Sequence, residues 1–217
     1  MKMKGLKNTN GFGELGTERS ILEKHGKWML AAVVFLALGF GGAQYYSQYQ
    51  TKQTIKVSAV YDEMLFALQK QDKALAREKG EILLKQGDRT PYAALGALML
   101  AKLDIEAEDL SAAKEHLAVK HFQNAPLALQ AVAKVRLARV LAAEKNYDEA
   151  LNVLNEENPP GFETLFDEAK GDIYLLQNQK EKASKAFQAA IMNAPQGVPV
   201  WRMQIKQTEL GMKKEES

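Results

Sequence analysis

Apolar residues return every three or four positions along most of this chain, and one segment near its start is apolar without interruption. From Lys52 onward the sequence is rich in Ala, Leu, Lys, Gln and Glu, in the spacing that is typical of amphipathic helices. No stretch shows the period of two that half-buried strands require. The sequence therefore predicts an all-α fold that follows a single apolar segment.

Helix-breaking residues divide the helical part at regular intervals. The breaks lie at residues 86–88, 124–126, 158–161 and 194–199. After the first break, Thr90 is placed to be an N-cap residue and Pro91 to be the first residue of a helix. Two helices between successive breaks predict an array of helical hairpins. We expect an opening hairpin near 55–69 and 72–86 and a closing helix near 198–211.

One segment of the array, Thr164–Gly197, resembles a tetratricopeptide repeat. Small residues in this pattern let the two helices approach closely, large residues fill the space beside them, and a proline ends the second helix. The positions that match the pattern are Gly171, Tyr174, Ala183, Phe187, Ala190 and Pro195. The early Trp of the repeat family is absent.

Two further copies precede this repeat and match the pattern less well. Ala138 and Ala150 stand 33 residues before Gly171 and Ala183, so the middle copy keeps both small residues. A more degenerate copy lies upstream, where Asp104 occupies the position of the repeat's aromatic residue. We therefore predict a tetratricopeptide-like helical-hairpin solenoid with atypical ends.

The apolar segment Trp28–Ala43 has the length and the flanks of a membrane anchor. As a helix extended by three residues it would rise roughly 28 Å, close to the hydrocarbon thickness of about 30 Å. A tryptophan begins it and three tyrosines follow it, as suits the headgroup regions. Six basic residues against three acidic ones precede it, which favours a cytoplasmic N-terminus. We predict a cytoplasmic tail (1–27), a transmembrane anchor (28–49) and a periplasmic domain (50–217).

Two other interpretations of the apolar segment remain open. A cleaved signal peptide would use the small residues Gly41, Gly42 and Ala43, and a soluble protein would bury the segment as a core helix. The long acid-containing N-terminal region and the tyrosines beyond the cleavage position favour a retained anchor. Gly39, Gly41 and Gly42 would support a close helix–helix contact in lipid, or else form only a weak stretch of the anchor.

Composition and charge argue against several classes of function but do not identify one. The chain has a formal net charge of +2 and no cysteine. Because the basic excess lies in the first 27 residues, the rest is nearly neutral, which argues against nucleic-acid binding. His116 and His121 match no metal-binding spacing and are interpreted as polar surface residues. Acidic residues alternate with lysines as on solvated helix faces, so we expect no catalysis, cofactor or metal ion.

The sequence around residues 92–102, 137–140 and 170–174, together with the order of tail, anchor and repeat domain, resembles the YfgM family of bacterial inner-membrane proteins. The resemblance extends from about Ile21 to the end of the chain. It implies association with the SecYEG translocon and with the membrane-anchored periplasmic chaperone PpiD. An interaction protein of this kind helps newly exported proteins leave the translocon.

The resemblance to tetratricopeptide repeats also implies a partner-binding groove, because four positions of each first helix face the concave side of such arrays. Carried onto this chain, the groove residues are Lys102, Val132, Val135, Arg139, Leu165, Glu168, Asp172 and Leu175, with Leu95, Leu98, Ile105 and Ala142 at the remaining positions. This apolar stripe with charges of both signs suits a peptide or a partner helix. A short array could instead curl until the apolar members pack together as core.

Two classes of function follow from these observations. The favoured one is a membrane-anchored periplasmic interaction protein that works with the Sec translocon and a PpiD-like export chaperone. The alternative is a scaffold for cell-envelope or outer-membrane assembly complexes. An enzyme would need a convergent polar pocket that the sequence does not show.

Overall fold

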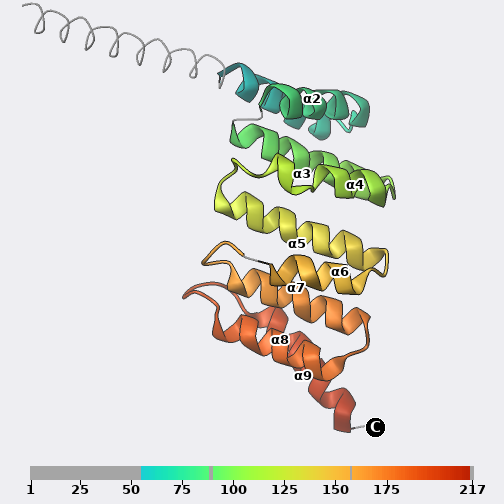
Figure 1. Cartoon of the computed structure of the whole chain (residues 1–217), viewed down its shortest axis with the longest axis vertical. Coiled ribbons are helices and arrows are strands. Elements are labelled where there is room, and N and C mark those ends of the chain that lie inside the picture. The colour runs from blue at the N-terminus through green and yellow to red at the C-terminus, as the bar shows by residue number, and fades with distance from the viewer. Residues whose placement is uncertain (1–54, 88–89, 157, 216–217) are drawn as a thin grey trace, which may run out of the picture. The chain divides into compact units, whose positions relative to one another are not determined.

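The computed structural model describes residues 55–87, 90–156 and 158–215, which form helices joined by short turns (Figure 1). These residues contain no strand, which confirms the all-α prediction for this part of the chain. None of the described helices is long and apolar enough to cross a membrane. The predicted tail (1–27) and anchor (28–49) lie outside the described residues.

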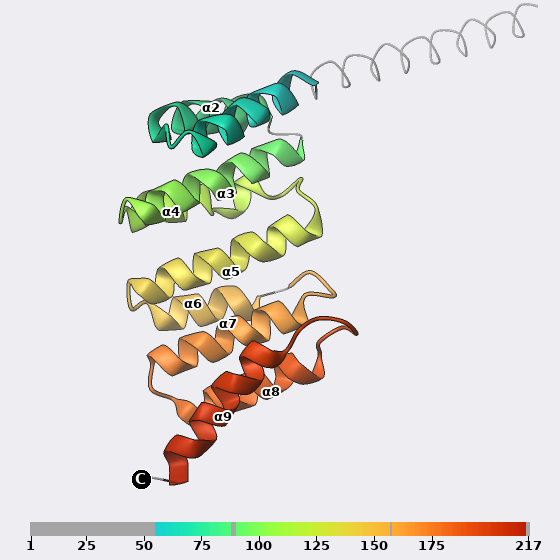
Figure 2. The same cartoon turned by 180° about the vertical axis from the view of Figure 1, so that it is seen from behind.

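Successive helices pair as hairpins that stack one on the next (Figures 1 and 2). The opening hairpin consists of a helix over residues 55–69 and α2 (Lys73–Gln86). The next three pairs are α3 (Pro91–Glu106) with α4 (Leu110–His116), α5 (Leu127–Ala143) with α6 (Tyr147–Asn155), and α7 (Glu163–Leu176) with α8 (Lys180–Met192). The predicted opening hairpin is therefore confirmed.

Two further elements complete the array. The short 3-10 helix η1 (Val119–His121) lies in the connection between α4 and α5. The closing helix is α9 (Trp201–Glu215), which packs against α8 and begins three residues later than predicted. Thr90 is the N-cap residue of α3, as predicted, but its hydroxyl donates to the carbonyl of Gly87 (2.9 Å) and caps no helix N–H.

The hydrophobic core is a series of four clusters, and each cluster joins a hairpin to the next element of the stack. One cluster contains Ala138 and Leu141 of α5, Leu154 of α6, and Phe166 and Ile173 of α7. The three other clusters join the opening hairpin to α3, the second hairpin to α5, and α8 to α9. Because each hairpin buries side chains only against its neighbours, stability is built by stacking, as in other repeat arrays.

Small residues allow the helices to pack closely at these contacts. A Cβ atom added to Gly171 would lie 2.5 Å from Cε1 of Phe187, and one added to Gly80 would lie 2.7 Å from the side chain of Leu100. Such distances are well inside van der Waals contact, so a side chain at either glycine would push the helices apart.

The same turn joins the two helices of every hairpin. Each first helix is followed by a non-glycine residue with positive φ, namely Gln71, Glu108, Lys145 and Asn178. The next residue donates its N–H to a carbonyl five positions earlier, as Gln179 does to Tyr174 (2.8 Å) and Asp109 does to Asp104 (2.9 Å). This is the hydrogen bond of a Schellman motif. The turn therefore places Asp104 and Tyr174 at equivalent positions of two repeats.

Replacing Gly171 by Ala should destabilise the array by about 1–3 kcal/mol, because the added methyl group would overlap the ring of Phe187. Gly211 in α9 is the matched control, since a Cβ there meets no heavy atom within 4 Å. Gly211→Ala should stabilise the protein by up to about 1 kcal/mol, because Ala is the better helix former. Chemical denaturation followed by circular dichroism measures both changes, and equal shifts would contradict the packing described above.

Candidate functional site

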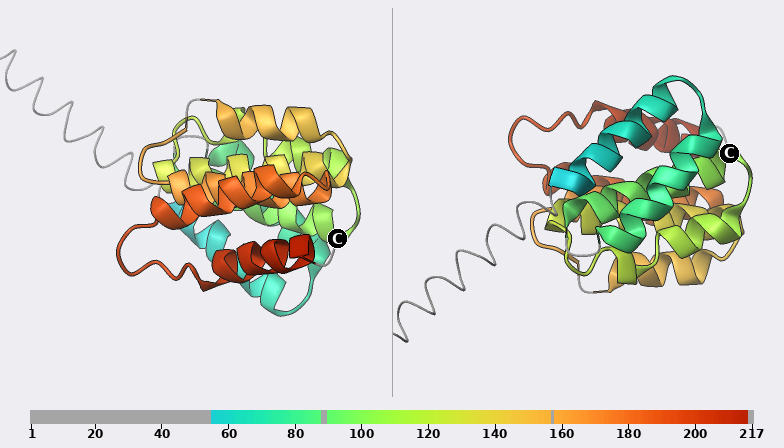
Figure 3. Two further views of the ribbon diagram at one scale, coloured as in Figure 1. Left: turned by 90° about the horizontal axis from the view of Figure 1, so that it is seen from below. Right: turned by 90° about the horizontal axis from the view of Figure 1, so that it is seen from above.

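The first helices of the hairpins and α9 form one face of the array, which we call the inner face. It consists of the helix over residues 55–69, α3, α5, α7 and α9. In views along the stack, α9 and the helix over residues 55–69 lie at one side of the array and α6 lies at the opposite side (Figure 3). The groove residues predicted from the sequence all belong to α3, α5 and α7.

The structure divides the predicted groove residues into buried and accessible ones. Val135 is only 2% exposed and belongs to the core, together with Leu98 and Ala142, so these side chains are not available to a partner. The half-buried members are Val132, Leu165, Glu168, Asp172 and Leu175. The exposed ones among the eight are Lys102 and Arg139. The accessible part of the predicted stripe therefore combines charged and apolar side chains, and its two most exposed members among the eight are cations.

The repeat-signature residues lie mainly in the core between the helices of the hairpins. The fully buried ones are Ala138, Ala150, Ala183, Phe187 and Ala190. Gly171 is buried against Phe187, whereas Tyr174 is half-buried, with the Nζ of Lys182 at 5.6 Å from its ring centroid. Pro195 is exposed in the loop that follows the end of α8.

The charged groove residues pair with one another across successive inner helices. The Nη2 atom of Arg139 on α5 lies 3.6 Å from Oδ2 of Asp172 on α7. The other oxygen of Asp172 accepts a hydrogen bond from Nζ of Lys206 on α9 (2.5 Å), and Lys206 also lies 3.8 Å from Glu168. These four residues form a charge path that joins α5, α7 and α9. Lys206 is not among the predicted groove residues because it lies on the closing helix, outside the repeats from which the groove was predicted.

A pocket of about 310 Å³ lies between α3 and α5 on the inner face. Ile105 and Leu110 contribute apolar surface, and Val140 and Ala143 face them from α5. The polar lining residues are Lys102, Glu106, Arg136 and Arg139. The pocket therefore contains two of the predicted groove residues, Lys102 and Arg139, beside an apolar wall.

Arg136 differs from the other half-buried charged side chains of the described residues in its partners. Its Nη1 donates to the carbonyl of Leu98 (3.1 Å), and burial, together with the nearby charge of Arg139, lowers the pKa of its guanidinium from the usual value. Within the described part of the chain, no carboxylate lies within 4.0 Å of Arg136, whereas each other half-buried Lys, Arg, Asp or Glu has an oppositely charged partner within that distance. Because a guanidinium stays protonated in proteins, this half-buried charge lacks a counterion.

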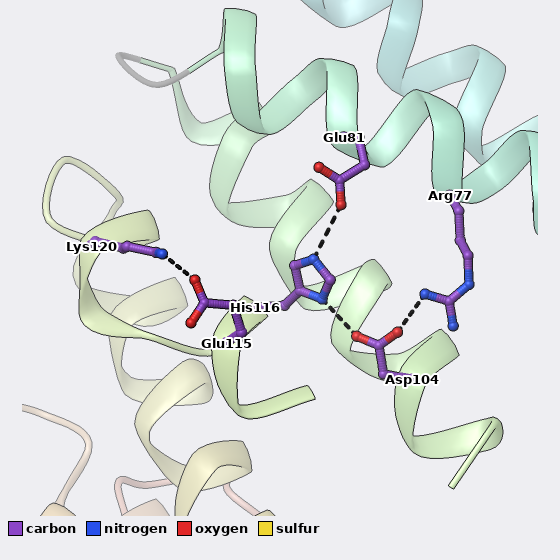
Figure 4. A network of polar contacts seen from close by, with 6 residues as sticks. All are labelled: Arg77, Glu81, Asp104, Glu115, His116 and Lys120. Carbon is purple, nitrogen blue, oxygen red and sulfur yellow. Dashed lines mark hydrogen bonds and ion pairs between the residues drawn. The ribbon is translucent and has the colours of Figure 1, made fainter. Parts of the chain in front are cut away.

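An ionic network around a buried carboxylate lies between α2, α3 and α4 (Figure 4). Asp104 is fully buried and accepts a hydrogen bond from Arg77, and its other oxygen lies 2.6 Å from Nδ1 of His116. The second ring nitrogen of His116 lies 3.3 Å from Glu81. The Asp104 network, consisting of these four residues, thus ties two hairpins together. Within the described residues, no three His, Asp or Glu side chains are arranged to hold a metal ion.

This network corrects the interpretation of His116 as a surface residue. Its side chain is only 14% exposed because it packs between Asp104 and Glu81. His121 is half-buried, and burial lowers the pKa of its imidazole. The signal that would have revealed the network is Asp104 itself, because a carboxylate at a core position of a repeat requires charged or donating partners.

Comparison with known proteins finds a matching family model and several similar proteins. A family model described as "Tetratricopeptide repeat-like domain" matches residues 19–212. A relative in Aggregatibacter actinomycetemcomitans is 32% identical over 165 residues, which are 75% of this chain and 80% of the relative. A relative in Neisseria gonorrhoeae is 30% identical over 186 residues, 84% of this chain and 88% of its own. A relative in Escherichia coli is 27% identical over 166 residues, 74% and 79% of the two chains. Each is named "Ancillary SecYEG translocon subunit".

Asp104→Asn should destabilise the protein by about 1–3 kcal/mol or more, because it removes the charge that Arg77 and His116 face in a buried site. Glu106→Gln on the same helix is the control, since Glu106 pairs with Lys73 at the surface, where solvent screens the two charges and the pair contributes little to stability. Thermal unfolding of the two variants gives the comparison. A smaller loss for Asp104→Asn than for Glu106→Gln would show that the network does not support the fold.

Proposed function

This chain belongs to the YfgM family of tetratricopeptide repeat-like proteins, and we propose that it is an ancillary subunit of the SecYEG translocon. The names of the relatives support this function, and the alignments span four fifths or more of the relatives from Aggregatibacter actinomycetemcomitans and Neisseria gonorrhoeae. The observation that carries the proposal is therefore similarity along most of the chain, beyond a shared repeat motif.

In this proposal the chain is a single-pass protein of the bacterial inner membrane. The apolar segment Trp28–Ala43 with its basic N-terminal flank supports an anchor whose N-terminus is cytoplasmic. The domain of residues 50–217 would then lie in the periplasm, next to the exit of the translocon. A tether of this kind raises the local concentration of the domain to about the millimolar range without new contacts, so weak binding by the domain suffices.

The inner face supports a role in protein–protein interaction. Its accessible groove residues include charged and apolar side chains, and the pocket between α3 and α5 is lined by two of the charged ones, Lys102 and Arg139. We propose that this face binds a PpiD-like periplasmic chaperone or an emerging chain, which would assist newly exported proteins. This function requires a surface that a partner protein can bind, and it does not require catalysis.

The proposed topology predicts which positions a membrane-impermeant thiol reagent reaches. Because the chain has no cysteine, a single Cys introduced at Asn8 or at the exposed Lys182 reports its own position. In intact spheroplasts the Cys at Lys182 should react and the Cys at Asn8 should not. The reverse labelling, or a mature protein that begins after Ala43, would contradict the anchor and its orientation.

Purification of the full-length protein in mild detergent tests which proteins bind it in the membrane. We expect SecY and a PpiD-like chaperone to co-purify, and Arg139→Glu should reduce recovery of the chaperone severalfold because it reverses an exposed charge on the inner face. Lys185→Glu on the outer helix α8 is the matched charge reversal and should leave recovery unchanged. Recovery of envelope-assembly proteins without SecY would favour the scaffold alternative.

Asp172 is less suitable than Arg139 for this test. Its carboxylate binds Lys206 and so helps to hold α9 against the array. A substitution at Asp172 would combine loss of a recognition charge with loosening of α9, and lost binding would not identify the cause.

A further inference from the structure

The pocket between α3 and α5 combines an open apolar wall with a positive charge that has no counterion. Ile105 is 41% exposed although it is a large apolar residue, and it lies beside Leu110 and Val140 in the lining. At about 310 Å³ the pocket lies at the lower end of the range for ligand sites, roughly 300–1,000 Å³. Its size therefore suits one or two inserted side chains better than a whole cofactor.

Among the described residues, the charged groups around the pocket leave Arg136 without a carboxylate partner. Glu106 already pairs with Lys73 (2.8 Å) and lies 3.8 Å from Lys102, and Arg139 pairs with Asp172. Arg136 makes one hydrogen bond, to the Leu98 carbonyl, and has no carboxylate within 4.0 Å among the described residues. A guanidinium has five N–H donors, and its planar fork matches a carboxylate. The donors left over make Arg136 an anion-binding group at the edge of an apolar pocket.

We propose that this pocket binds an acidic, apolar segment of a partner protein, with a bulky apolar side chain against Ile105 and a neighbouring Asp or Glu carboxylate on Arg136. Charge complementarity selects this occupant, because a basic segment would bring like charges toward Arg136 and Arg139. The proposal rests on the function proposed above and specifies the partner chemistry that the inner face recognises.

The smaller pocket of about 170 Å³ provides a comparison on another side of α5. Its lining includes Phe122, Leu137 and Lys134, and Lys134 lies 3.8 Å from Glu156. The positive charge at this pocket is therefore already balanced by the protein. A partner carboxylate would gain less there, so the two pockets of α5 should differ in their preference for acidic ligands.

Binding to a defined peptide tests the proposal with the full-length protein in lipid nanodiscs. The probe is a fluorescent peptide that contains interleaved Leu and Glu residues, with blocked ends, and empty nanodiscs give the baseline. A peptide with Gln in place of Glu and one with Ser in place of Leu are the ligand controls. Fluorescence anisotropy should show binding of the Leu/Glu peptide and at least about tenfold weaker binding of both controls.

Protein variants then identify the pocket. Arg136→Gln should weaken binding about tenfold and Arg136→Lys should retain part of the affinity, whereas Lys134→Gln should change it less than about twofold. If Arg136→Gln unfolds the domain, Ile105→Asp replaces it, because this exposed position would place a carboxylate beside Arg136 and block the pocket. Equal affinity for the Glu and Gln peptides would overturn the proposal. Unchanged binding by a folded Arg136→Gln variant, or by Ile105→Asp where it is used instead, would also overturn it.

Co-purification of SecY with the same wild-type protein separates the two conclusions. If SecY follows the protein but the peptide does not bind through Arg136, the pocket assignment fails and the translocon function stands. If SecY does not co-purify but peptide binding depends on Arg136, the pocket assignment stands and the function requires revision.

Discussion

The close approach of neighbouring helices is the constraint on which the rest of this structure depends. Gly171 against Phe187 and Gly80 against Leu100 leave no room for an additional methyl group. Contacts this close let each hairpin bury large side chains, such as Phe166 and Phe187, against its neighbours. Because the array has no single central core, every local change in helix spacing is transmitted only to the adjacent hairpins.

Close packing also decides which polar groups can exist between the hairpins. Asp104 stands at the position that Tyr174 occupies in the last repeat, and the turns that follow both residues have the same hydrogen bond. An aromatic ring at this position fills space, whereas a carboxylate must be neutralised by neighbours. Arg77 donates a hydrogen bond to this carboxylate and His116 lies within hydrogen-bond distance of it, so the degenerate repeat replaces an apolar contact by an ionic one.

The sequence predicted the helices, their breaks and the repeat register because these depend on local patterns. Glycine and proline mark turns wherever they occur, and the spacing between Ala150 and Ala183 reports the repeat directly. The burial of a side chain on the inner face depends instead on how adjacent repeats are oriented relative to each other. The sequence of one repeat does not determine that orientation. Val135 was expected to line a groove and lies in the core, whereas Arg139 at the next groove position of the same helix is exposed. The Asp104 network required partners from α2 and α4, which only the fold brings together.

Unequal repeats explain why an open pocket occurs beside α5. The residues with positive φ in successive turns are 37 positions apart up to Lys145 and then 33 apart at Asn178. The extra residues of the second repeat include η1 and Phe122, which is buried and packs beneath α5. The outer helix α4 of this repeat has only 7 residues, whereas α5 has 17. The long helix therefore presents more surface than its short neighbour covers, and Arg136 lies on that surface without a carboxylate partner among the described residues.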